Sequence, residues 1–66
     1  MLIRINGQEK EIEDGLTISA LLSLLNIRLD GVAVDLNREI VPRRALAHAR
    51  LKEGDCVEIV RMTGGG

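Results

Sequence analysis

The fold is decided by residues 1–26, which read MLIRINGQEKEIEDGLTISALLSLLN. Apolar side chains occupy the odd positions from Met1 to Ile5, the alternation of a half-buried strand. Asn6-Gly7 follows, and both residues tolerate the positive φ of a type I′ hairpin turn. Glu9–Glu13 then returns as a polar strand with one large apolar residue, Ile12, which suits a sheet edge.

A helix is predicted to follow this hairpin. Thr17 can cap its N-terminus, because a threonine oxygen accepts a hydrogen bond from the first turn. Apolar residues then recur at i, i+3, i+4 and i+7, which places on one face Ile18, Leu21, Leu22 and Leu25. Asn26 is a suitable stop, since Asn tolerates the left-handed cap conformation.

Three further strands complete the predicted sheet, at 32–36, 39–41 and 56–62, and residues 43–52 permit a helical turn. The order strand, strand, helix, strand, short strand, strand predicts an α+β domain of the ubiquitin-like β-grasp type. Its mixed sheet would have four to five strands, with one main helix packed on one face. We expect residues 1–62 to form this domain and residues 63–66 to form a flexible, glycine-rich C-terminal tail.

Composition excludes several classes of function. The 66 residues carry 9 basic and 10 acidic side chains and no Phe, Tyr or Trp, so we expect no nucleic-acid partner. Charged residues interrupt every long apolar run, and no leader pattern is visible at Met1. We therefore expect a cytoplasmic domain with no membrane partner.

Neither catalysis nor metal binding is predicted. Cys56 is the single cysteine, and we interpret it as a strand thiol that behaves as a small apolar residue. His48 is interpreted as a solvent-exposed loop residue. One Cys with one His makes a poor zinc site, and the sequence offers no nucleophile–base pair, so we expect no catalytic and no metal-binding residues.

The C-terminal residues Gly64, Gly65 and Gly66 allow two interpretations. They could be a frayed end of no consequence. Alternatively, a chain without side chains is the thinnest available, and residues 63–66 could extend about 13 Å into a narrow channel of another protein. Gly64 and Gly65 would allow this insertion, and the Gly66 carboxylate would be the reactive group. ATP could activate that carboxylate as an acyl-adenylate for attack by sulfur or by an amine.

A partner surface is predicted beside the tail. If Val57 and Ile59 face the helix, Val60 and Met62 face outward, because side chains alternate along a strand. We predict that Val60 and Met62, together with Leu2, form a small exposed apolar patch that contacts a partner.

Two charged stretches are also present. The acidic strip could steer docking to a basic enzyme, and it consists of Glu9, Glu11, Glu13 and Asp14. We interpret the basic stretch as solvated surface, and it consists of Arg43, Arg44, Arg50 and Lys52.

Three segments in the right order give the chain a resemblance to a known family. Val32–Arg43 reads VAVDLNREIVPR and is similar to a family segment of the form VAVxxNxxIVPR. Leu51–Asp55, LKEGD, forms a turn before the last strand, and Gly65-Gly66 ends the chain. Over its whole length the sequence resembles the sulfur carrier protein of thiamine biosynthesis, the ThiS family.

The resemblance implies a protein co-substrate rather than an enzyme, with no cofactor bound to the carrier itself. A ThiF-like adenylyltransferase would adenylate the Gly66 carboxylate with Mg-ATP. Sulfur from a donor such as a cysteine desulfurase persulfide would then convert it to a thiocarboxylate. A ThiG-like thiazole synthase would take that sulfur into the thiazole ring of thiamine.

Two departures from the family pattern leave alternatives open. Residues 45–47 are Ala-Leu-Ala where many members have an aromatic residue, and Met62-Thr63 precedes the glycines where Val or Ile with Ala or Gly is commoner. One alternative is the small-subunit sulfur carrier of molybdopterin synthase or another ubiquitin-like sulfur carrier, serving cysteine or tRNA thiolation. A second is a ubiquitin-like protein modifier, and a third is a non-catalytic β-grasp binding module.

Overall fold

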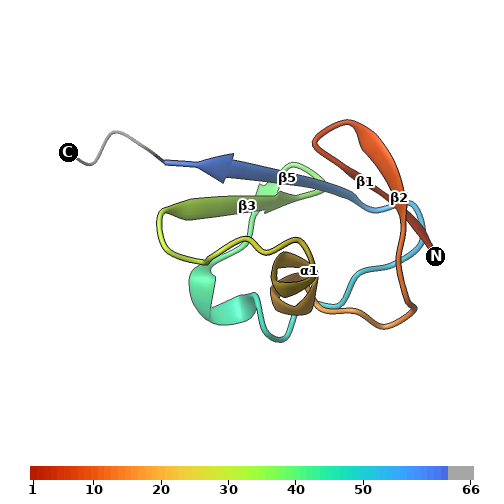
Figure 1. Cartoon of the computed structure of the whole chain (residues 1–66), viewed down its shortest axis with the longest axis horizontal. Coiled ribbons are helices and arrows are strands. Elements are labelled where there is room, and N and C mark those ends of the chain that lie inside the picture. Colours follow the sequence, from red (N-terminus) through yellow and green to blue (C-terminus); the bar gives the residue numbers. More distant parts are fainter. Residues whose placement is uncertain (63–66) are drawn as a thin grey trace.

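Five strands and one helix account for the regular structure of residues 1–62, the part of the chain that the computed structural model describes (Figure 1). The strands are β1 (Leu2–Ile5), β2 (Gln8–Glu11), β3 (Val32–Leu36), β4 (Glu39–Ile40) and β5 (Cys56–Arg61). The helix α1 (Ile18–Leu24) crosses one face of the sheet, and a 3₁₀ turn covers Arg43–Ala45. The predicted mixed sheet with one main helix is therefore confirmed. The predicted tail lies outside the described residues.

The sheet order is β2-β1-β5-β3-β4, so the last strand lies at its centre. β5 pairs in parallel with β1 and antiparallel with β3, and the two hairpin pairs are antiparallel. The arrowhead of β5 lies at the opposite end of the molecule from the N-terminus (Figure 1). This arrangement brings the first and last strands together and directs the end of β5 away from Met1.

The first hairpin follows the local sequence closely. Asn6 and Gly7 have φ values of 48° and 85°, as the type I′ turn requires. Strand β2 starts one residue before the predicted range 9–13 and ends two residues earlier. Ile12 is nevertheless buried, and its N–H donates to the Met1 carbonyl at 2.8 Å. Burial of this one side chain therefore holds the chain against the domain just after the end of the polar edge strand β2.

Packing holds the short helix in place. The Thr17 Oγ1 accepts from the Ala20 N–H at 3.1 Å, which confirms the predicted cap. Asn26 has a φ of 59° and ends the helical segment in the left-handed conformation, also as predicted. The buried helix residues share one core with residues of the sheet and of the later loops, and together these are Ile3, Ile12, Ile18, Leu21, Leu22, Val34, Leu46, Leu51 and Val57. Within residues 1–62, no helix is long and apolar enough to cross a membrane.

Candidate functional site

Strand β5 leads directly into the residues predicted to carry the reactive tail. It pairs with β3 along five positions, from Leu36 opposite Val57 to Val32 opposite Arg61. Its parallel pairing with β1 covers only two, Arg4 opposite Cys56 and Ile5 opposite Val57. The first half of β5 is therefore supported on both sides, whereas its second half has a strand on one side only.

A polar cluster fixes the start of β5. Asp55 is only 8% exposed, and its carboxylate accepts from the Asn37 Nδ2 at 3.1 Å and from the Lys52 N–H at 2.8 Å. Asn37 also binds Cys56 twice, since its Oδ1 accepts from the Cys56 N–H at 2.9 Å and its own N–H donates to the Cys56 carbonyl at 2.8 Å. A buried carboxylate needs such donors, because losing water without replacement is costly. We call this group the Asn37–Asp55 cluster.

Asn6 supports the other side of β5. Its N–H donates to the Val57 carbonyl at 2.9 Å. Its side-chain Oδ1 accepts from the Ile59 N–H at 2.8 Å, and its Nδ2 donates to the Ile59 carbonyl at 3.4 Å. The amide side chain thus continues the hydrogen-bond ladder one step beyond β1, as a further backbone peptide would. Past Ile59, no group of β1 or of its turn pairs with β5 in the described part of the chain.

The end of β5 exposes two large apolar side chains. Val60 and Met62 are 54% and 64% exposed, while Val57, on the opposite face, is 1% exposed and lies in the core. The outward orientation is as predicted, and the role of Val60 and Met62 as a partner surface stays a prediction. Ala33 lies opposite Val60 on β3, and Ile40, two strands away on the same face, is 76% exposed. The exposure of Ile40 was not predicted, although the sequence shows that it alternates with Glu39 and Val41.

The comparisons with known proteins agree with this geometry. The model of the ThiS family matches residues 3–66. The chain belongs to the ThiS family. It is 33% identical over all 66 residues to the sulfur carrier protein ThiS of Escherichia coli, whose whole length it covers. It is 41% identical over all 66 residues to a thiazole synthase of Paramagnetospirillum magneticum, of whose length it spans only 20%.

A solved structure supports the same assignment. The crystal structure of a thiamine biosynthesis protein, ThiS, of Geobacter metallireducens superposes with a TM-score of 0.89. Each chain is covered completely, at 33% sequence identity. The predicted ubiquitin-like β-grasp fold and the resemblance to the ThiS family are therefore confirmed.

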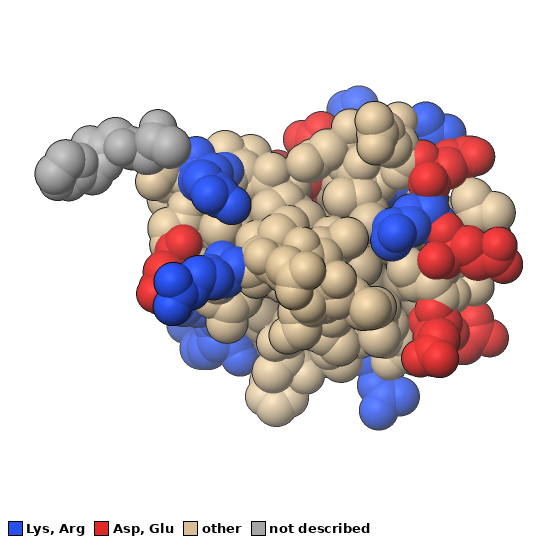
Figure 2. Space-filling view, viewed as in Figure 1, with Lys and Arg blue, Asp and Glu red and all other residues tan. Residues whose placement is uncertain are grey.

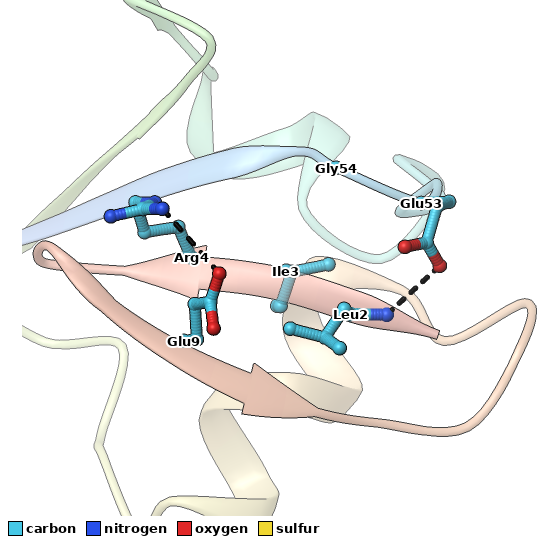
Figure 3. A pocket seen from close by; sticks show the side chains of 6 residues that line it. All are labelled: Leu2, Ile3, Arg4, Glu9, Glu53 and Gly54. Carbon is cyan, nitrogen blue, oxygen red and sulfur yellow. Dashed lines mark hydrogen bonds and ion pairs between the residues drawn. The ribbon is translucent and has the colours of Figure 1, made fainter.

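Within this ThiS-family fold, the prediction that Leu2 lies beside Val60 and Met62 is wrong. The parallel register places Leu2 next to Gly54, whose N–H donates to the Leu2 carbonyl at 2.8 Å. Val60 is six residues after Gly54 in the chain, about 20 Å away at the rise of an extended strand. Leu2 instead lines a shallow depression (Figure 3), where its N–H donates to the Glu53 Oε1 at 3.0 Å.

The remaining candidate residues do not assemble a catalytic site. Cys56 was expected to behave as an apolar strand thiol, but it is free and exposed on the outer face of the sheet. His48 is exposed, as predicted. Among residues 1–62, no three His, Cys, Asp or Glu side chains lie where they could hold a metal ion together. Gly66, predicted to be the reactive residue, and Gly64 and Gly65, predicted to allow insertion, lie outside the described residues. The described part of the candidate site is therefore the end of β5 and the residues that support this strand.

Proposed function

We propose that this ThiS-family chain is a sulfur carrier of thiamine biosynthesis that works through the carboxylate of Gly66. One observation supports this most strongly. β5 is bonded on both sides through Ile59, and it then ends with exposed side chains directly before the glycine tail. A fixed strand that leads into a slim segment is what a partner needs in order to receive that segment in a narrow channel.

The chemistry requires activation, because a carboxylate is inert toward nucleophiles. In the proposed first step, a Gly66 carboxylate oxygen attacks the α-phosphorus of Mg-ATP, and pyrophosphate leaves. The terminal sulfur of a persulfide then attacks the acyl-adenylate carbonyl, and AMP leaves. A thiol cleaves the resulting acyl disulfide and is itself oxidised to a disulfide, which releases the thiocarboxylate. A ThiF-like adenylyltransferase would catalyse the first step, and a cysteine desulfurase would supply the persulfide.

The carrier contributes no cofactor and no catalytic group in this proposal. Its domain would act as a handle, and Val60 and Met62 would contact the partner beside the inserted tail. An apolar contact next to the tail excludes water and fixes the depth of insertion. Leu2 has no part in this contact, because it lies at the other end of β5. We expect these reactions to take place in the cytoplasm.

The proposed sulfur acceptor is a ThiG-like thiazole synthase. The Paramagnetospirillum magneticum thiazole synthase contains a segment similar to this whole chain within a polypeptide about five times as long. A thiazole synthase of Magnetococcus marinus shows the same relation, with 36% identity over 66 residues. A carrier-like segment in the same polypeptide as the synthase supports a working partnership between the two.

Intact-mass measurement tests the proposal. The chain would be incubated with a ThiF-like adenylyltransferase, Mg-ATP and a persulfide donor, and an authentic ThiS protein would be treated in parallel. We expect a mass increase equal to the exchange of one oxygen for sulfur, absent from a variant that lacks Gly66. An unchanged mass, while the authentic carrier shifts, would contradict the proposal. Conjugates of higher mass would indicate a protein modifier instead.

A further inference from the structure

We infer that Arg28 and Arg61 bind an acidic rim around the channel that receives the tail, so that charge directs the carrier tail-first onto its partner. This inference rests on the proposed function, since it takes insertion of the tail into another protein as given. It adds the charge of the partner surface, which would be acidic. The acidic strip in the sequence had suggested a basic partner instead.

The two arginines line the same depression at the end of β5 although they are far apart in the chain. A surface depression of about 490 Å³ is lined by Asn26, Arg28, Asp30, Gly31, Arg61 and Met62. The Met62 N–H donates to the Gly31 carbonyl at 2.6 Å, which brings the loop before β3 against the end of β5. The depression is therefore next to the last residue before the tail, where a partner that holds the tail must make contact.

The positive charges of Arg28 and Arg61 are not paired with carboxylates of the described part of the chain. Asp30 is its one carboxylate, and the Arg43 Nη2 already donates to the Asp30 Oδ1 at 2.8 Å. Within residues 1–62, neither Arg28 nor Arg61 lies within ion-pair distance of a carboxylate. Two guanidinium groups thus keep their N–H donors for an outside acceptor, and their planar geometry matches carboxylates well.

Acidic residues of the first hairpin and of the segment after it lie toward the other end of the molecule. Glu11 lies opposite Leu2 in the hairpin, and Asp14 is 3.4 Å from the Met1 ammonium group. Figure 2 shows Lys and Arg side chains near the end of β5 and most of the visible Asp and Glu at the opposite end. A basic enzyme steered by the acidic strip would meet the end farthest from the tail. An acidic partner surface would instead draw in the tail end first.

Equilibrium binding to a ThiF-like adenylyltransferase, measured by calorimetry without ATP, tests the inference. The variant R28E/R61E reverses both charges of the depression. K10E/K52E is the matched control, because it changes the net charge equally at two exposed lysines that make no ion pair in the described chain. We expect R28E/R61E to raise Kd at least about tenfold at about 0.01 M salt and by only about threefold at 0.1 M, where screening is stronger. K10E/K52E should change Kd less than about threefold.

Three results would overturn the inference. These are equal changes of Kd in the two double variants, an effect that does not depend on salt, and ATP alone shifting the Arg28 and Arg61 side-chain NMR signals of the free carrier. The milder R28Q/R61Q variant, with its fold verified by circular dichroism, covers the case in which charge reversal disturbs folding. It should weaken binding by an intermediate factor. Because binding is read without ATP, a failure of thiocarboxylate formation leaves this test intact.

Discussion

The two halves of β5 differ in the support that they receive from neighbouring strands. Over Cys56–Ile59 the strand is bonded on both sides, to β3 and the Asn37–Asp55 cluster on one side and to β1 and Asn6 on the other. Over the last residues only the β3 side is paired, and Val60 and Met62 are more than half exposed. The first half is therefore held on both sides and contributes Val57 to the core, whereas the second half is held on one side and exposes two apolar side chains. The support from β1 and Asn6 stops at Ile59, whereas the pairing with β3 continues to Arg61.

Removal of the Asp55 carboxylate should have the largest effect on stability. Asp55→Ala leaves the Asn37 Nδ2 and the Lys52 N–H without their acceptor in a nearly buried place. We expect a loss of about 3 kcal/mol in the free energy of unfolding, measured by urea denaturation, against a total of about 3–10 kcal/mol for a chain of this length.

Asp55→Asn serves as the control for this change. It keeps the shape of the side chain and one acceptor oxygen, so the expected loss is smaller, about 1–2 kcal/mol. A loss below about 1 kcal/mol for the Ala variant would show that water replaces the cluster and that β5 is held mainly by apolar packing.

Truncation within β5 compares its two halves directly. Val57→Ala removes two carbon atoms from a fully buried side chain and leaves a cavity, so we expect it to cost about 2 kcal/mol of unfolding free energy. Val60→Ala makes the same chemical change at a site that is 54% exposed and should cost less than about 0.5 kcal/mol. Similar losses at both sites, in the same thermal and urea experiments, would mean that the end of β5 is part of the core.

Replacement of Asn6 tests where the support of β5 ends. Asn6→Gly removes the side-chain bonds to Ile59, whereas glycine adopts the positive φ of this position without strain. We expect a loss of about 1 kcal/mol in the free energy of local opening at Ile59. This corresponds to about fivefold faster hydrogen exchange of the Ile59 amide. Exchange of the Cys56 amide, held by Asn37, is the internal control and should change by less than about twofold. Equal acceleration of both amides would indicate global destabilisation instead.

Local features of this fold could be predicted from sequence because they depend on neighbouring residues. The Asn6-Gly7 turn, the Thr17 cap and the Asn26 stop all formed where the residue types indicated. The length of β2 was less predictable. A strand ends where its partner stops pairing, and the partner of β2 is β1, which is only four residues long.

The supports of the site could not be predicted, because they join residues that are distant in the chain. Asn37 and Asp55 are 18 residues apart, and Asn6 and Ile59 are 53 apart. The alternation of β5 indicated that Val60 and Met62 face outward, but it carried no information on register. The register with β1 separated Leu2 from them. The register with β3 brought the loop that carries Arg28 to the end of β5, where Arg28 and Arg61 line one depression.

The smallest expected effect on stability belongs to the exposed half of β5. Val60→Thr keeps the β-branched shape and adds a hydroxyl group on the solvent face, so the free energy of unfolding should change by less than about 0.5 kcal/mol. Binding to a ThiF-like adenylyltransferase should weaken by about threefold to tenfold, because a desolvated apolar contact is lost. Ile40→Thr is the matched control, since Ile40 is exposed on the same face but lies two strands away.

Weakening at Val60 alone would confine the partner surface to the end of β5. Equal weakening would extend it across the sheet to β4, and no weakening at either position would leave the tail and the arginines beside it as the whole contact.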